Sequence, residues 1–158
     1  MNTQNNFQKT EEIGRTLFRD FANQAKNVTD LKFEEDQYSP TDCTYKVNDK
    51  LVVGEIKVRD EYCKNFDDLI LEKKKYDSIK DKVNELNAKG GIYINYIGEN
   101  TLYLFNIDKI NDYTCKRENK GCKRTTAEYS GYTNKDVYLV PKSLGIKYEY
   151  NGDKWMKS

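Results

Sequence analysis

The spacing of apolar residues along the chain predicts two long amphipathic helices. Over residues 6–27, apolar side chains recur at helical intervals and form one broad hydrophobic face. Over residues 66–89, apolar and aromatic side chains recur in the same way, and Gly90-Gly91 follows as a stop signal. We expect both helices to bury these faces.

Alternation of apolar and polar residues predicts the strands. Residues 28–34 form a first strand, and two runs at 43–47 and 51–58 flank Asn48-Asp49-Lys50, whose turn formers indicate a tight hairpin. Four further strands are expected, the first two joined through Gly98-Glu99-Asn100: 91–97, 101–107, 137–140 and 146–150.

The order of these elements predicts an α/β fold. One helix is followed by three antiparallel strands, a second helix and a further strand, an αβββαβ core with a mixed central sheet flanked by helices. A right-handed crossover would place strand 92–97 parallel to a core strand. At 158 residues, we expect one domain spanning residues 1–158.

Composition limits the kinds of catalytic and binding site that the chain can form. The chain has 34% charged residues, but its 13% aromatic share favours a packed globule over disorder. Lys and Arg total 27 against 26 Asp and Glu, so any nucleic-acid binding must come from a local patch. The absence of His excludes His-based triads, bases and metal sites.

Cysteine use and hydropathy indicate a cytoplasmic protein. The four cysteines form no Cys-x-x-Cys pair, and the first residues lack the features of a signal peptide, so we expect reduced thiols. Cys115 and Cys122 flank a basic segment and could pair or supply half of a zinc site. No apolar run approaches membrane-spanning length. The Asn-, Lys- and Tyr-rich composition suits a bacterium or its phage.

The first hairpin carries the candidate chemistry. Asp42 lies at the start of its first strand, and Glu55, Lys57 and Arg59 share one face of its second strand. Adjacent unpaired ions are costly on a half-buried strand. Two carboxylates are a typical Mg²⁺ ligand set, and Lys57 could activate water beside a phosphate. Alternatively, Glu55 and Lys57 form an exposed pair and Asp42 merely starts a turn.

Other charged residues also have two interpretations. Glu11 lies nearly on the apolar stripe of the first helix, as a helix-start charge or a functional group, whereas Glu12 is turned away. The run Glu72-Lys73-Lys74-Lys75 is either a solvated helix face or reaches the site. Residues 116–124 carry five cations to one anion and predict a flexible loop, either merely solvated or contacting phosphates.

The hairpin residues resemble a known family. Pro40-Thr41-Asp42, a gap of twelve residues and then Glu55-Ile56-Lys57 is similar to the motif of the PD-(D/E)XK nuclease superfamily. That superfamily includes Holliday junction resolvases, phage exonucleases and many restriction endonucleases. One departure is that Thr41 separates the proline from the aspartate.

The resemblance implies a restriction-endonuclease-like fold and a DNA nuclease that uses Mg²⁺ or Mn²⁺ and acts in DNA processing or recombination, either as a homodimer or with a helicase partner. It implies that Asp42, Glu55, the Ile56 carbonyl and Glu11 (or Glu12) hold the metal, that Lys57 positions or deprotonates the water, and that Lys75 clamps the scissile phosphate. Nucleic-acid contacts would come from basic residues near the site and in the basic segment: Arg59, Lys73, Lys116, Arg117, Lys120, Lys123 and Arg124. The alternatives are a catalytically inactive DNA-binding module of the same fold and a protein-interaction module.

Overall fold

The two-residue turn at Asn48 and Asp49 sets the register of the first hairpin. Both residues have positive φ, 50° and 66°, which Asn and Asp tolerate better than most residues and which matches the twist of a tight hairpin. The pairing runs from Val47↔Lys50 at the turn to Cys43↔Gly54 at the far end. The predicted hairpin is therefore confirmed.

The fold comes from a computed structural model that describes residues 3–36, 38–123 and 132–158. Its elements, in chain order, are α1 (Thr3–Gln24), β1 (Val28–Phe33), β2 (Cys43–Val47), β3 (Lys50–Arg59), η1 (Glu61–Asn65), β4 (Asp68–Glu72), α2 (Lys73–Leu86), β5 (Gly90–Ile97), β6 (Thr101–Asn106), η2 (Ile107–Lys109), β7 (Lys116–Lys123), β8 (Tyr132–Pro141), η3 (Lys142–Leu144), β9 (Ile146–Tyr150) and β10 (Trp155–Lys157).

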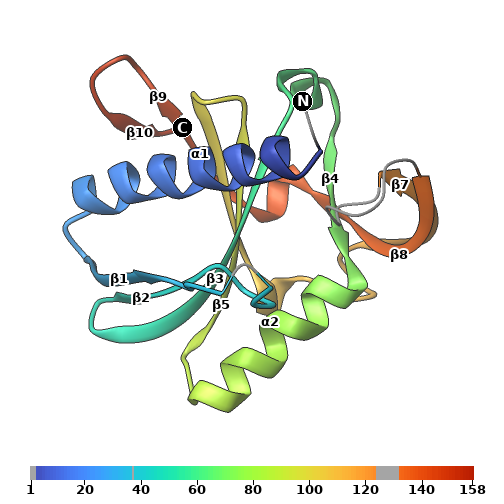
Figure 1. The fold of residues 1–158 in the computed structure, drawn as a ribbon, viewed down its shortest axis with the longest axis horizontal. Coiled ribbons are helices and arrows are strands. Elements are labelled where there is room, and N and C mark those ends of the chain that lie inside the picture. The colour runs from blue at the N-terminus through green and yellow to red at the C-terminus, as the bar shows by residue number, and fades with distance from the viewer. Residues whose placement is uncertain (1–2, 37, 124–131) are drawn as a thin grey trace.

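A mixed seven-stranded sheet forms the centre of the molecule, in the order β1-β2-β3-β5-β6-β9-β10. Strands β3 and β5 are parallel, as the predicted crossover requires, and the other neighbours in this sheet are antiparallel. Helices α1 and α2 lie on opposite sides of this sheet (Figure 1). A second sheet, in the order β4-β8-β7, lies beside it. The predicted α/β class is confirmed.

Each face of the central sheet has its own hydrophobic core. The α1 face buries Phe18 and Phe21 against Tyr45 and Tyr96. Gly14 lets α1 approach β3 closely, since a Cβ there would lie 3.0 Å from a methyl group of Ile56. The α2 face buries a second set of side chains, including Leu71, Ile79, Tyr93, Ile97 and Phe105.

The predicted second helix is wrong in its first part and at its end. Residues 68–72 form strand β4, because Leu69 and Leu71 alternate with less buried neighbours and pair with Val140 and Tyr138 of β8. Helix α2 begins at Lys73 and ends before Asn87, which adopts a left-handed conformation with φ of 51°. Gly90-Gly91 then opens strand β5.

The prediction for the basic segment also needs correction. Residues 116–123 form strand β7, which pairs along its whole length with β8, so this part of the predicted flexible loop is wrong. Arg124 lies outside the described residues. Within the described residues, no helix is both long and apolar enough to cross a membrane.

Gly54 gives the first testable prediction. An added Cβ would lie 2.7 Å from Cys43 Sγ and 3.0 Å from Ile94 Cδ1, so Gly54→Ala forces β2 away from β3. We expect a loss of about 1–3 kcal/mol in the free energy of unfolding, measured by urea denaturation. Gly90→Ala is the matched control, since its Cβ would approach nothing closer than 3.9 Å. Equal stability of the two variants would contradict the close approach at Gly54.

Candidate active site

Asp42 is held where strand β2 begins. Its amide donates to the Gly54 carbonyl at 3.0 Å, and its own carbonyl accepts from the Glu34 amide at 2.9 Å. Beyond the Cys43↔Gly54 pair, the next free amide of β3 on this side belongs to Ile56, and it donates to Asp42 Oδ2 at 2.7 Å. Two main-chain hydrogen bonds therefore hold the backbone of Asp42, and a third holds its carboxylate.

Glu55 lies opposite Asp42, because the β2–β3 register continued by one position pairs these two residues. Its side chain faces α2 and is only 8% exposed. Its Oε1 lies 3.1 Å from the Lys75 ammonium, which comes from the first turn of α2. Its Oε2 is buried and finds no hydrogen-bond partner among the described residues.

The two carboxyl groups disfavour each other's charge. Burial, and next the negative charge of Asp42, raise the pKa of Glu55 to about 8, against the opposing effects of Lys75 and Lys57. Burial also raises the pKa of Asp42, although the Ile56 amide and the nearby cations oppose this. Such a pair is stabilised by additional positive charge.

Helix α1 brings a third carboxyl group and an unpredicted cation. Burial, and next the charge of Asp42, raise the pKa of half-buried Glu11, so Glu11 lies near the pair, whereas Glu12 is exposed. The charge of Arg15 lowers the pKa of both Glu11 and Asp42. Arg15 lies 5.3 Å from the centre of the Phe33 ring. Its spacing four residues after Glu11 was the sequence signal for a shared helix face.

Lys57 lies on the same face of β3 as Glu55, two positions further along the strand. It is exposed, yet the surrounding protein and the positive charge of Arg59 lower the pKa of its ammonium. Glu72 and Glu55 oppose this shift, so Lys57 lies within electrostatic range of both. The structure thus brings Asp42, Glu55, Lys57, Lys75 and Glu11 to one region, while their roles stay predictions.

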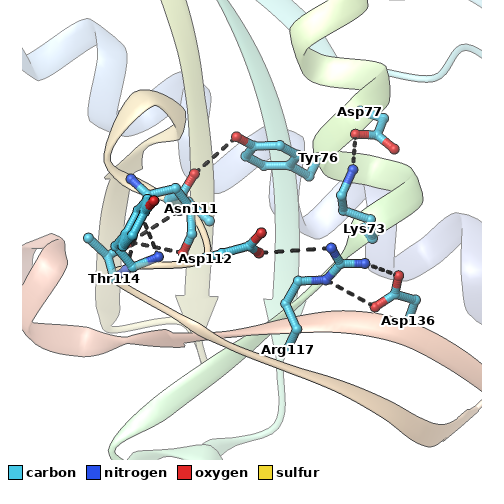
Figure 2. Close-up of polar contacts among 10 residues, drawn as sticks. Lys73, Tyr76, Asp77, Asn111, Asp112, Thr114, Arg117 and Asp136 are labelled. Carbon is cyan, nitrogen blue, oxygen red and sulfur yellow. Dashed lines mark hydrogen bonds and ion pairs between the residues drawn. The ribbon is translucent and has the colours of Figure 1, made fainter.

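Two predicted nucleic-acid contacts are engaged within the protein. Arg59 donates to Asn95 Oδ1 at 2.7 Å, to the Tyr93 hydroxyl at 2.9 Å and to the Ile70 carbonyl. Lys73 pairs with Asp77 one turn along α2 (Figure 2). Both side chains therefore have structural partners that a phosphate would have to displace.

The predicted contacts of the basic segment now lie on strand β7. Arg117 is tied to Asp112 and Asp136, as Figure 2 shows. Lys116 and Lys120 are exposed, and Lys123 ends the strand. Arg124, together with the side chains of Lys123 and Cys122, lies outside the described part of the chain. Cys115 is a buried free thiol.

The residues present fit a hard divalent cation. Among the described residues, no three Asp, Glu, Cys or His side chains are grouped closely enough to hold a metal ion, so a metal here would rest on fewer side chains. Mg²⁺ is often held by one or two carboxylates, with water and substrate phosphate completing its shell. Asp42, Glu55 and the Ile56 carbonyl match this need. The carbonyl lies on the strand edge that faces Asp42, because a strand residue directs its N–H and C=O to one side. The partnerless Glu55 Oε2 supplies an unused ligand.

Comparison with known proteins identifies the fold. The chain matches no family model and no curated protein. Among solved structures it is similar to Hjc, a Holliday junction resolvase from the archaeal hyperthermophile Archaeoglobus fulgidus, with a TM-score of 0.56 and 11% identity. The likeness covers 87% of this chain and 90% of that chain. It confirms the predicted fold class, a mixed α/β fold like that of the resolvase.

The raised pKa of Glu55 predicts how stability depends on pH. The folded-state pKa of about 8 lies above the ordinary value of 4.5, so the folded state holds an extra proton between these values and stability falls as pH rises across this window. Glu55→Gln cannot lose that proton. Between about pH 5 and about pH 8, the free energy of unfolding of this variant should therefore rise by more than about 1.4 kcal/mol relative to that of the wild type.

Urea denaturation with EDTA present measures this difference. Glu12→Gln is the matched control, since Glu12 is an exposed glutamate of α1. Its stability should follow the wild-type pH dependence. If the Glu55→Gln curve also runs parallel to the wild type, Glu55 is ionised in the folded protein throughout and the buried-pair description fails.

Proposed function

We propose that this chain is one nuclease-like domain that hydrolyses DNA phosphodiester bonds with the help of Mg²⁺ or Mn²⁺. The observation that carries the proposal is the placement of Asp42 and Glu55 opposite each other, with Lys57 on the same face, in a fold shared with a Holliday junction resolvase. An ordinary exposed Glu-Lys pair would not explain a glutamate that is 8% exposed and lacks a partner on one oxygen.

Each residue of the site has a proposed task. Asp42, Glu55 and the Ile56 carbonyl would hold the metal, with Glu11 in contact with it through water. When bound, the divalent ion would supply charge stabilisation and a more acidic water. Lys57, whose pKa is lowered, would position the attacking water or, in its neutral form, take its proton. Lys75 releases Glu55 and binds the scissile phosphate instead.

The paired sheet β4-β8-β7 supports a contact with nucleic acid outside the site. Its exposed Lys116 and Lys120 lie on a strand rather than on a loop, so their spacing is fixed. Contacts of this kind neutralise phosphates without reading bases. Arg59, Lys73 and Arg117 contribute less in this proposal, because they already have partners within the protein. Lys73 and Arg117 pair with acidic side chains, and Arg59 donates to neutral side-chain and main-chain oxygens.

The catalytic assignment predicts the effect of three substitutions. Asp42→Ala, Glu55→Ala and Lys57→Ala should each leave a folded protein whose cleavage rate falls at least about 100-fold, equivalent to about 2.7 kcal/mol of lost transition-state stabilisation. The assay follows double-stranded, single-stranded and branched DNA with Mg²⁺, Mn²⁺ or EDTA. Lys50→Ala is the matched control on the same strand, because Lys50 is exposed at the hairpin turn and should be dispensable.

The same assay separates the alternatives. DNA binding with a steep salt dependence but no metal-stimulated cleavage would identify an inactive DNA-binding module. Binding of neither DNA nor divalent metal would favour a protein-interaction module. Normal cleavage by all three alanine variants would show that the reaction is carried out elsewhere.

Metal binding gives a readout that does not depend on cleavage. Mg²⁺ or Mn²⁺ at about 100 times its Kd should stabilise the wild type by about 2.7 kcal/mol, seen as a rise in melting temperature. Asp42→Asn with Glu55→Gln should abolish the rise, because both ligand charges are lost. Glu12→Gln with Asp49→Asn removes the same charge at exposed positions and should keep it. An equal rise in both double variants would place the metal elsewhere.

A further inference from the structure

A polar pocket lies on the central sheet away from the site described above. It has a volume of about 290 Å³, and its floor includes buried Thr101 and half-buried Tyr103. Three lysines line it, and each comes from a different element: Lys64 of η1, Lys142 of η3 and Lys147 of β9. The elements that meet here are far apart in sequence, and the proposed reaction does not use any of these side chains.

The lysines differ in how firmly they are held. Lys142 is fixed, since its ammonium donates to the Cys63 carbonyl at 2.8 Å and the Lys64 carbonyl at 3.3 Å, beside the ring of Tyr103. In the described part of the chain, the ammonium groups of Lys64 and Lys147 pair with surface carboxylates, those of Glu61 at 3.5 Å and Glu149 at 2.7 Å.

These contacts leave a site suited to an anion. Exposed ion pairs are worth little and exchange readily. Lys64 and Lys147 can therefore turn to a ligand while Lys142 keeps its charge in place. With three cations and one lining carboxylate, Glu149, the pocket has a net positive lining. Tyr103 adds an aromatic ring beside it, which suits a phosphate carried by a nucleotide.

The pocket lies on the same sheet face as Glu55. Glu55 pairs with Tyr93 on β5, so both side chains lie on the same face of the sheet. Ile97, four residues after Tyr93, lies on that face too and lines the pocket. Ile97 pairs with Arg59, four residues after Glu55, which is about 13 Å along the strand. The pocket also reaches across β6 to β9, three strands from β3, so this component along the strand is a lower limit on its separation from Glu55. A stacked nucleic-acid strand advances about 3.4 Å per nucleotide, so the separation corresponds to at least about four nucleotides.

We infer that this pocket binds a backbone phosphate of the same DNA strand, at least about four nucleotides from the bond that is cleaved. Lys64, Lys142 and Lys147 take the phosphate, and Tyr103 lies beside the attached nucleotide. The link to a cleaved strand rests on the proposed function. The recognition of a nucleotide phosphate rests on the pocket alone.

Binding in EDTA tests the pocket without cleavage. A labelled single strand of about 12 nucleotides is titrated by fluorescence anisotropy, a length within the range of known single-strand sites. Lys64→Gln with Lys147→Gln should weaken binding about tenfold and lower the slope of log K against log salt by about 0.7, the value for one lost phosphate contact. Lys26→Gln with Lys154→Gln removes equal charge at exposed positions outside the pocket and should change neither quantity.

A second variant shifts affinity the other way. Glu149→Gln frees Lys147 from its ion pair and should tighten binding, whereas Asp153→Asn removes an exposed charge outside the pocket and should not. Opposite signs from neighbouring substitutions are not produced by unfolding, which thermal denaturation checks separately.

Competition distinguishes the sources of the phosphate. Failure of a deoxynucleoside monophosphate or inorganic phosphate to displace the oligonucleotide supports a strand subsite. Displacement, with NMR shifts at Asn100 and Thr101, supports a phosphate site filled by free nucleotides and overturns the link to the cleaved strand. Wild-type affinity in the Lys64/Lys147 variant, with no such shifts, overturns the pocket altogether. These binding measurements use neither metal nor cleavage. Their interpretation therefore does not change if the proposed nuclease activity proves wrong.

Discussion

The hydrogen bond from the Ile56 amide to Asp42 Oδ2 is the interaction on which the site depends. Strand β2 starts at Cys43, one residue short of the position opposite Glu55, and so leaves an unpaired amide on a central strand. A buried amide without a partner would be costly, and the Asp42 carboxylate satisfies it. The same bond turns that carboxylate toward Glu55. Hydrogen-bonding geometry at the end of one short strand thus creates both the local stability and the close approach of two acids.

The parts of the fold that local sequence determines could be predicted. The Asn48-Asp49 turn requires positive φ, which few other residues accept, and the apolar stripe of α1 has one consistent period. The start of α2 could not be predicted, because Leu69 also continues the helical stripe of Tyr76 and Ile79, seven and ten residues later. The alternation of Leu69 and Leu71 fits a strand instead. Their pairing with Val140 and Tyr138, about seventy residues later, decides for the strand. Strand β7 shows the same limit, since its sequence is polar throughout and only its ladder with β8 makes it a strand.

The site was predictable to the extent that one hairpin contains it. Asp42, Glu55 and Lys57 lie within sixteen residues, and turn geometry with side-chain alternation already places them together. The surroundings come from tertiary packing: Lys75 reaches Glu55 only because α2 begins where β4 ends, and Arg15 approaches Asp42 only because Gly14 lets α1 lie close to β3. The hydrogen bonds that hold Arg59 also involve β4 and β5, so its alternation along β3 alone did not reveal them.

The balance of charge explains why an unfavourable cluster persists in a protein whose net charge is only +1. Burial and mutual repulsion oppose ionisation of Asp42 and Glu55, while Lys75 and Lys57 favour it. Replacing one carboxylate by an apolar group would remove the repulsion, so stability alone does not require the pair. Sites that keep a perturbed acid pair beside movable lysines are typical of catalysis, because a ligand can complete the charge balance that the fold leaves open. In the proposed reaction, Lys75 is suited to this exchange, because it lies in the first turn of α2 with a partly exposed side chain. It could then move from Glu55 to a phosphate without disturbing the buried core beneath.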